Sequence, residues 1–179
     1  MKGVVFTEFL EMVSSMFGED MADDIIDDSN LPSGGAYTQV GTYDHTEIVA
    51  LVSALSVRTE TPVPTLLKVY GKHLFGRFSA LYPVFFETPQ TAFDFLSGIE
   101  NYIHVEVRKL YPDAELPTFD IARDGNNKLT MIYRSGRHFE DLAEGLIEGC
   151  LEYYKEDCLI EREDETTEGA GSVFTITKK

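Results

Sequence analysis

The sequence predicts an α+β fold, with helices in the first two-thirds of the chain and an antiparallel sheet with one further helix in the last third. Apolar residues recur at helical spacing as far as about Tyr111, whereas short stretches beyond Pro117 alternate apolar and polar residues around turn-forming residues. A chain of 179 residues with 43% hydrophobic side chains is long enough to bury a core. We therefore expect residues 1–179 to form a single domain.

The predicted helices each combine apolar residues at helical spacing with a glycine, proline or capping residue at one end. They cover Gly3–Phe17, Asp20–Asp28, a stretch beginning at Asp44 or Thr46 and running through Ser56, Pro62 to about Tyr82 with Thr61 as cap, and a long stretch from Pro89 to about Tyr111. Ser29–Gly35, which contains one proline and two glycines, is expected to be a loop. The long last helix has an apolar stripe formed by Leu96, Ile99, Ile103, Val107 and Leu110.

Two hairpins with a helix between them are expected after Pro117. Asp124–Asn127 has the composition of a turn, and it separates a short strand around Ile121 from the alternating stretch Lys128–Ser135. The pattern then predicts a helix over Phe139–Tyr154, followed by strands over Cys158–Glu163 and Ser172–Thr177 joined by Thr166–Gly171.

The charge balance excludes two classes of partner. Fifteen basic residues against 31 acidic ones give a net charge of −16. Such a field repels nucleic-acid backbones and anionic lipid, so we expect neither nucleic acid nor a membrane as partner. Two cysteines indicate a reduced compartment, and no signal-type or membrane-spanning apolar run is found, so the protein is expected to be cytoplasmic.

Tyr133, Ser135 and Arg137 form the most informative local pattern. On a strand, alternate side chains point to one face, which would place a phenol, a hydroxyl and a guanidinium in a row. Three such donors suit an elongated anion, because the guanidinium binds carboxylate through two parallel hydrogen bonds. The alternative is an ordinary solvent-facing strand edge, which is the more frequent meaning of such spacing.

His104 is the second candidate. On a helix it shares a face with Phe93, Glu100 and Val107 and lies at the margin of the apolar stripe, where a neutral imidazole could ligate a metal. A histidine in such a place is more often a structural residue, and this alternative stays open. The sequence contains no nucleophile elbow and no phosphate-binding glycine loop.

Taken together, these residues resemble the haem nitric oxide/oxygen binding (H-NOX) family, which is related to the sensor domain of soluble guanylate cyclase. The resemblance covers essentially the whole chain and looks like the stand-alone bacterial type. It rests on the opening Met1-Lys2-Gly3, on His104 followed thirteen residues later by Pro117, and on the Tyr-x-Ser-x-Arg motif at Tyr133. It implies the H-NOX fold, with haem b buried between the helical part and the sheet.

The resemblance also implies a role for each site residue. In the family, His104 would be the fifth iron ligand, Tyr133, Ser135 and Arg137 would hold the haem propionates, and Pro117 would press on the porphyrin. Gly71 resembles a family glycine that acts as a pivot. The remaining haem contacts implied by alignment are apolar: Met1, Val5, Phe9, Leu74, Phe78, Leu142 and Leu146.

The implied function is a gas sensor without catalysis of its own. Oxygen-binding members carry a tyrosine where this chain has Leu142, so a pocket without a hydrogen-bond donor predicts binding of NO and CO at ferrous haem and exclusion of oxygen. The signal would follow from weakening of the Fe–His104 bond and would pass to a separate histidine kinase or diguanylate cyclase/phosphodiesterase. The alternative is a haem enzyme of peroxidase-like or NO-detoxifying type, although the inferred distal residues include no acid–base group.

Overall fold

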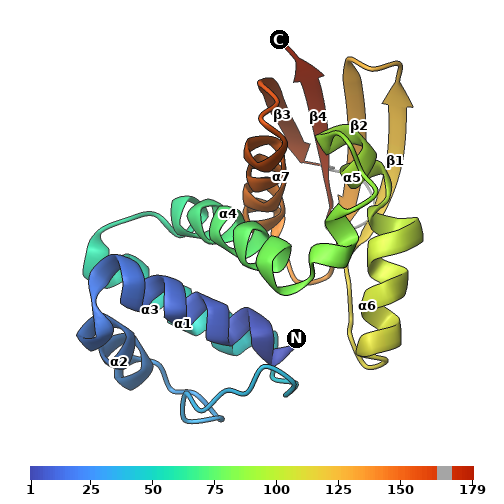
Figure 1. Cartoon of the computed structure of the whole chain (residues 1–179). Coiled ribbons are helices and arrows are strands. Elements are labelled where there is room, and N and C mark those ends of the chain that lie inside the picture. Colours follow the sequence, from blue (N-terminus) through green and yellow to red (C-terminus); the bar gives the residue numbers. More distant parts are fainter. Residues whose placement is uncertain (165–170) are drawn as a thin grey trace.

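The computed structural model describes residues 1–164 and 171–179. Its elements are α1 (Gly3–Phe17), α2 (Glu19–Asp28), α3 (His45–Thr59), α4 (Val63–Leu81), η1 (Pro83–Phe86), α5 (Ala92–Ser97), η2 (Ile99–Ile103), α6 (His104–Leu110), β1 (Thr118–Asp124), β2 (Lys128–Arg134), α7 (Glu140–Tyr154), β3 (Cys158–Asp164) and β4 (Gly171–Lys178). Helices α1 to α3 lie together away from the sheet, and α4 leads from them to α7 (Figure 1). This arrangement confirms the predicted α+β fold.

Local sequence sets the limits of the first helices. Helix α1 has the predicted limits and buries one apolar side against α2 and α4, with Phe6, Phe9 and Val13 fully buried. Asp44 rather than Thr46 caps α3, because its carboxylate accepts the Thr46 backbone N–H at 2.8 Å.

The described strands form one antiparallel sheet in the order β1-β2-β4-β3. Strand β2 lies between β1 and β4, and its register places Tyr133 opposite Phe119 on one side and opposite Ser172 on the other. Helix α7 follows β2 and packs along the sheet toward α4 (Figure 1). Both predicted hairpins are confirmed, although most of the loop predicted at Thr166–Gly171 lies outside the described residues.

The crossing of α4 and α7 joins the helical part to the sheet. Gly71 on α4 faces the backbone of α7 at Leu142, and Gly145 on α7 faces the backbone of α4 at Lys68. A Cβ atom at either glycine would lie closer to these backbone atoms than any real contact allows. The two helices therefore approach backbone to backbone because neither has a side chain at the crossing point.

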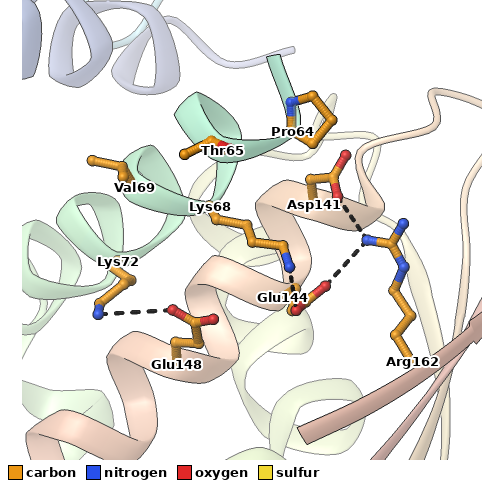
Figure 2. Close-up of a pocket in the computed structure, with 9 residues that line it drawn as sticks. All are labelled: Pro64, Thr65, Lys68, Val69, Lys72, Asp141, Glu144, Glu148 and Arg162. Carbon is orange, nitrogen blue, oxygen red and sulfur yellow. Dashed lines mark hydrogen bonds and ion pairs between the residues drawn. The ribbon is translucent and has the colours of Figure 1, made fainter. Parts of the chain in front are cut away.

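Ion pairs surround this crossing on its solvent side. Lys68 of α4 contacts Glu144 of α7 at 2.5 Å, and Arg162 of β3 reaches Glu144 at 3.1 Å and Asp141 at 2.7 Å. These side chains line a surface cavity of about 470 Å³, in which they point toward one another (Figure 2). Since most of them are half-exposed, the pairs orient the two helices more than they stabilise them.

Buried side chains gather into two apolar clusters. The N-terminal cluster lies among α1 to α4 and includes Phe6, Phe9, Ile48, Leu51, Tyr70, Leu74 and Phe139. The C-terminal cluster lies between the sheet, α5 and α7 and includes Phe93, Leu96, Met131, Tyr133, Ile147 and Phe174. Leu146 of α7 packs against both clusters, so α7 is the element that they share.

Three expectations from the sequence are wrong. The single helix expected from Pro89 to Tyr111 is divided into α5, η2 and α6. Thr61 does not cap α4, since the N-cap position is Pro62 and the Thr61 hydroxyl donates to the Thr59 carbonyl oxygen instead. The apolar stripe expected on the last helix is interrupted as well, since Leu110 is 58% exposed. In α1, the charged side chain of Glu8 is buried at 3% exposure because its carboxylate accepts hydrogen bonds from Arg77 of α4.

Among the helices of the described residues, none has both the length and the apolar character needed to cross a membrane.

Gly145→Ala tests the crossing. The added methyl group meets the backbone of α4, which cannot move aside cheaply, so the free energy of unfolding is expected to fall by about 1–3 kcal/mol. Gly76→Ala on α4 is the matched control: its Cβ meets nothing within 4 Å, and alanine favours a helix by up to about 1 kcal/mol. Thermal and urea unfolding measure both variants, and equal stability of Gly145→Ala and the parent protein would contradict the close approach.

Candidate functional site

His104 begins α6 and is buried at 8% exposure. Its Nδ1 atom lies 2.9 Å from Oε1 of Glu100, and the same carboxylate oxygen accepts the backbone N–H of Phe119 at 2.9 Å. Burial lowers the pKa of His104, and the neighbouring Glu100 carboxylate acts in the opposite direction. The imidazole is therefore neutral at pH 7, with Nδ1–H donating to Glu100 and the lone pair on Nε2.

A π-helical turn places His104 in the interior. The Gly98 carbonyl oxygen accepts both the Tyr102 N–H at 2.9 Å and the Ile103 N–H at 3.2 Å, and the His104 N–H reaches back to Ile99. Such a turn contains one residue more than an α-helical turn, which rotates the following residues by about 100° relative to an unbroken helix. The stripe expected from the sequence therefore does not continue: His104 is buried, whereas Leu110 is 58% exposed.

Phe119 connects His104 to Tyr133. The Phe119 ring lies 6.1 Å from the imidazole and 5.5 Å from the Tyr133 ring, centroid to centroid. Tyr133 is almost fully buried, and burial raises its pKa, while contacts with the Ser135 side chain and the Phe139 backbone oppose the shift. Pro117 is half-buried and directly precedes β1, two residues before Phe119.

The expected row of three donors on one strand face is wrong. Strand β2 ends at Arg134, so Tyr133 lies on the strand while Ser135 and Arg137 lie in the turn before α7. The turn forms because the Ser135 hydroxyl accepts the Arg137 backbone N–H at 3.2 Å and Gly136 follows directly after Ser135. Tyr133 is also buried between two strands, so a solvent-facing strand edge is wrong as well.

Arg137 already holds a carboxylate. Its Nη2 atom pairs with the Glu115 carboxylate, and Nη1 donates to the Glu115 carbonyl oxygen at 3.2 Å. The positive charge of Arg137 also reaches the α-amino group of Met1, whose pKa is lowered first by burial and then by this charge. Two cationic groups, one from each part of the fold, are thus within electrostatic range of one another.

The six residues predicted for the distal side belong to one group, together with Met1. Phe9 and Leu74 are buried members of the N-terminal cluster, and the other residues pack against it: Val5, Phe78, Leu142, Leu146 and Met1. They come from the N-terminus, α1, α4 and α7. The structure thus brings the predicted distal residues together in one cluster. Helix α7, which contributes to that cluster, follows Tyr133 and Arg137 in the chain.

Hydroxyl groups in this N-terminal cluster are engaged elsewhere. The Tyr70 hydroxyl donates to the Val5 carbonyl oxygen, and the Tyr37 hydroxyl donates to Glu47 at 2.8 Å. The Tyr43 oxygen accepts the Thr38 backbone N–H at 2.9 Å. The phenol groups of these three tyrosines are therefore hydrogen-bonded to backbone groups or to Glu47.

Sequence reasoning did not assign a role to Glu100, Phe119 or Glu115. Glu100 could have been found, because it precedes His104 by four residues and side chains at that spacing meet on a helix. Phe119 and Glu115 carry no such signal, since their partners are brought to them only by the fold.

These residues fit a haem group. The neutral imidazole of His104 has Nδ1 occupied and Nε2 available, which is the state in which histidine ligates iron. Arg137 binds the Glu115 carboxylate, the same chemical group that a haem propionate presents. The apolar residues gathered around Phe9 and Leu74 suit the body of a porphyrin.

Comparisons with known proteins identify the class. A family model described as haem-NO-binding matches residues 2–162. The chain is similar to the unliganded Fe(II) H-NOX protein from K. algicida, with 41% identity, a TM-score of 0.93 and coverage of 100% of this chain and 97% of that chain. It is similar to the H-NOX protein from Shewanella woodyi in the Fe(II)CO state, with 42% identity, a TM-score of 0.85 and coverage of 100% and 95%.

A third structure, the H-NOX protein from S. oneidensis in the Fe(II)NO state, is 23% identical with a TM-score of 0.92 and coverage of 100% and 99%, and it supports the fold. Comparison with curated proteins gave no match.

The fold and the family model together define a haem-binding gas-sensor domain. The chain belongs to the haem-NO-binding, or H-NOX, family.

The two cysteines are not predisposed to react. Cys150 is fully buried on α7, and burial raises the pKa of its thiol well above the usual range; burial also raises the pKa of Cys158. The thiolate is the reactive form, so both thiols are protonated at pH 8.

We expect Cys150 of the native protein to resist iodoacetamide at pH 8, with Cys158 modified slowly and both modified in urea. Peptide mass spectrometry over a time course measures the two rates. Rapid modification of native Cys150 would contradict its burial.

Proposed function

We propose that residues 1–179 act as one haem-binding domain that binds NO and CO at ferrous haem b and excludes oxygen. The observation that carries this proposal is the apolar character of the distal residues together with the engaged hydroxyl groups around them. The H-NOX protein from Shewanella woodyi, which is 42% identical, has a solution structure in the Fe(II)CO state. Its similarity supports CO as a ligand here.

When bound, haem would supply a ferrous iron that takes up a small gas. Nε2 of His104, which Glu100 leaves free, would hold that iron. Tyr133, Ser135 and Arg137 are assigned to the propionates. Pro117 and Met1 are assigned to contacts with the porphyrin, together with the distal residues.

The distal residues would select among gases because their side chains offer no hydrogen-bond donor. Oxygen depends on a hydrogen-bond donor because it takes negative charge from ferrous iron, whereas NO and CO take less and gain little from a donor. Val5, Phe9 and Leu142 offer carbon atoms only in their side chains. The Tyr70 hydroxyl already donates to the Val5 carbonyl oxygen and is not free to replace the missing donor.

Release of His104 is the proposed signal. His104 begins α6, so release of its imidazole from the iron would free that helix and the π-turn before it. The moving element then biases how α1 to α4 pack against the sheet, which alters the surface offered to a partner protein. We propose a histidine kinase or a diguanylate cyclase/phosphodiesterase as that partner in the cytoplasm; a basic patch on it would complement the net charge of −16.

A peroxidase-like or NO-detoxifying enzyme would need an acid–base group beside the gas. Two titratable side chains lie next to the distal residues in sequence, but neither is among the residues assigned to the distal side. The buried Glu8 carboxylate accepts a hydrogen bond from Arg77 at 2.6 Å. Burial lowers the pKa of His73, whose Nε2 atom is buried without a hydrogen-bond partner. We therefore propose a sensor with no catalysis of its own.

Leu142→Tyr is expected to move the protein toward oxygen binding. A hydroxyl donor on the distal side strengthens binding by about 1–3 kcal/mol, which is roughly 5- to 150-fold in affinity. Absorption spectra of the ferrous proteins in air measure the change. Leu142→Phe, which adds the ring without the hydroxyl, is the control and should remain without a stable oxygen complex; a persistent oxygen complex of the parent protein would contradict the proposal.

His104→Gly is expected to uncouple gas binding from output. The variant retains the Arg137 turn and the distal residues and can be supplied with free imidazole, but its axial ligand is no longer attached to α6. NO-dependent control of the partner, measured by autophosphorylation or cyclic dinucleotide synthesis, should disappear. Normal control in this variant without added imidazole would overturn the proposed route.

A further inference from the structure

Glu100 holds His104 from the side opposite to its free nitrogen. One carboxylate oxygen, Oε1, lies 2.9 Å from His104 Nδ1 and accepts the backbone N–H of Phe119 at the same distance. Both donors therefore converge on one atom. Because a carboxylate can only accept, Nδ1 carries the proton and Nε2 carries the lone pair.

Two elements of the fold fix the position of the Glu100 carboxylate. Glu100 lies in η2, the π-turn that rotates His104 inward, and Phe119 lies in β1, nineteen residues further along the chain. Phe119 also places its ring 6.1 Å from the imidazole. Glu100 thus ties the turn that carries His104 to the edge strand of the sheet, through a hydrogen bond with the backbone that does not depend on any other side chain.

We infer that Glu100 is the positioning residue of the proposed iron ligand: its carboxylate orients His104 and strengthens electron donation from Nε2 to the iron. This inference rests on the proposed role of His104. A carboxylate hydrogen-bonded to the second nitrogen of a ligating histidine fixes the ring and makes it a stronger donor. Glu100 therefore sets how readily His104 leaves when NO binds, and with it the sensitivity of the sensor.

A cavity beside Glu100 leaves room for substitutions that change the contact between Glu100 and His104. Glu100 and Phe119 line a surface cavity of about 590 Å³ together with Ser97, Asn101, Asp120, Ile121 and Arg123. The Glu100 side chain is 23% exposed, so water reaches the carboxylate. A substitution there changes the contact with His104 without opening a void in either apolar cluster, which makes the variants suitable for test.

A purely structural role for Glu100 predicts a different result. If Glu100 served only to anchor β1, any acceptor at this position would suffice, because the Phe119 N–H needs an oxygen and not a charge. Glu100→Gln keeps an amide oxygen that can accept from Phe119 and from His104 but removes the negative charge. The variant therefore separates electron donation from anchoring.

The test compares ferrous, haem-loaded parent protein, Glu100→Gln and Glu100→Ala by resonance Raman spectroscopy and NO titration. In Glu100→Gln the iron–histidine stretching band should move to lower wavenumber. The rate at which His104 leaves the iron after NO binding, followed by stopped-flow absorption, should rise by about tenfold or more. Glu100→Ala should shift the band further and broaden it, since the ring is no longer oriented.

Glu106→Gln is the matched control, because Glu106 lies on α6 and pairs with Lys109 in solvent. It should match the parent protein in both measurements. An unchanged band and release rate in Glu100→Gln, with the same thermal stability as the parent, would overturn the inference and leave anchoring as the role. If the parent protein shows no iron–histidine band that His104→Gly abolishes, the proposed function itself fails, which is a separate and recognisable outcome.

Discussion

The contact between α4 and α7 at Gly71 and Gly145 is the constraint on which the rest of the structure depends. Helix α4 carries part of the N-terminal cluster, and α7 is packed on the sheet, so their crossing fixes how the two parts face each other. Leu142 and Leu146 flank this crossing on α7 and belong to the residues proposed for the distal side. Close approach of two backbones therefore determines how these apolar residues are arranged relative to those of α4.

The two sides of the candidate site, the apolar residues and the surroundings of His104, are built from different kinds of structure. The proposed distal side is a set of apolar side chains on helices, whereas His104 contacts a carboxylate on a π-turn and an aromatic ring on a strand. Apolar packing tolerates small displacements, while a hydrogen bond of 2.9 Å is directional. The division suits a sensor, in which one side admits a ligand and the other responds to it.

Much of this structure could be predicted from the sequence, and the failures share a physical cause. Helix α1 and the first hairpin follow from apolar spacing and turn residues, which are local properties. The π-turn before His104 could not be predicted, because a pattern with a 3.6-residue period assumes an unbroken helix. The burial of Glu8 was missed because its partner Arg77 lies 69 residues away. The apolar residues proposed for the distal side rest on family resemblance rather than on periodicity.

The ion pair between Arg137 and Glu115 joins the turn before α7 to the segment that precedes β1. The Glu115 side chain is largely exposed, whereas that of Arg137 is largely buried. If Arg137 holds a propionate as proposed, that carboxylate would compete with Glu115 for one guanidinium. Binding of haem would then alter the contacts of the segment that leads into β1.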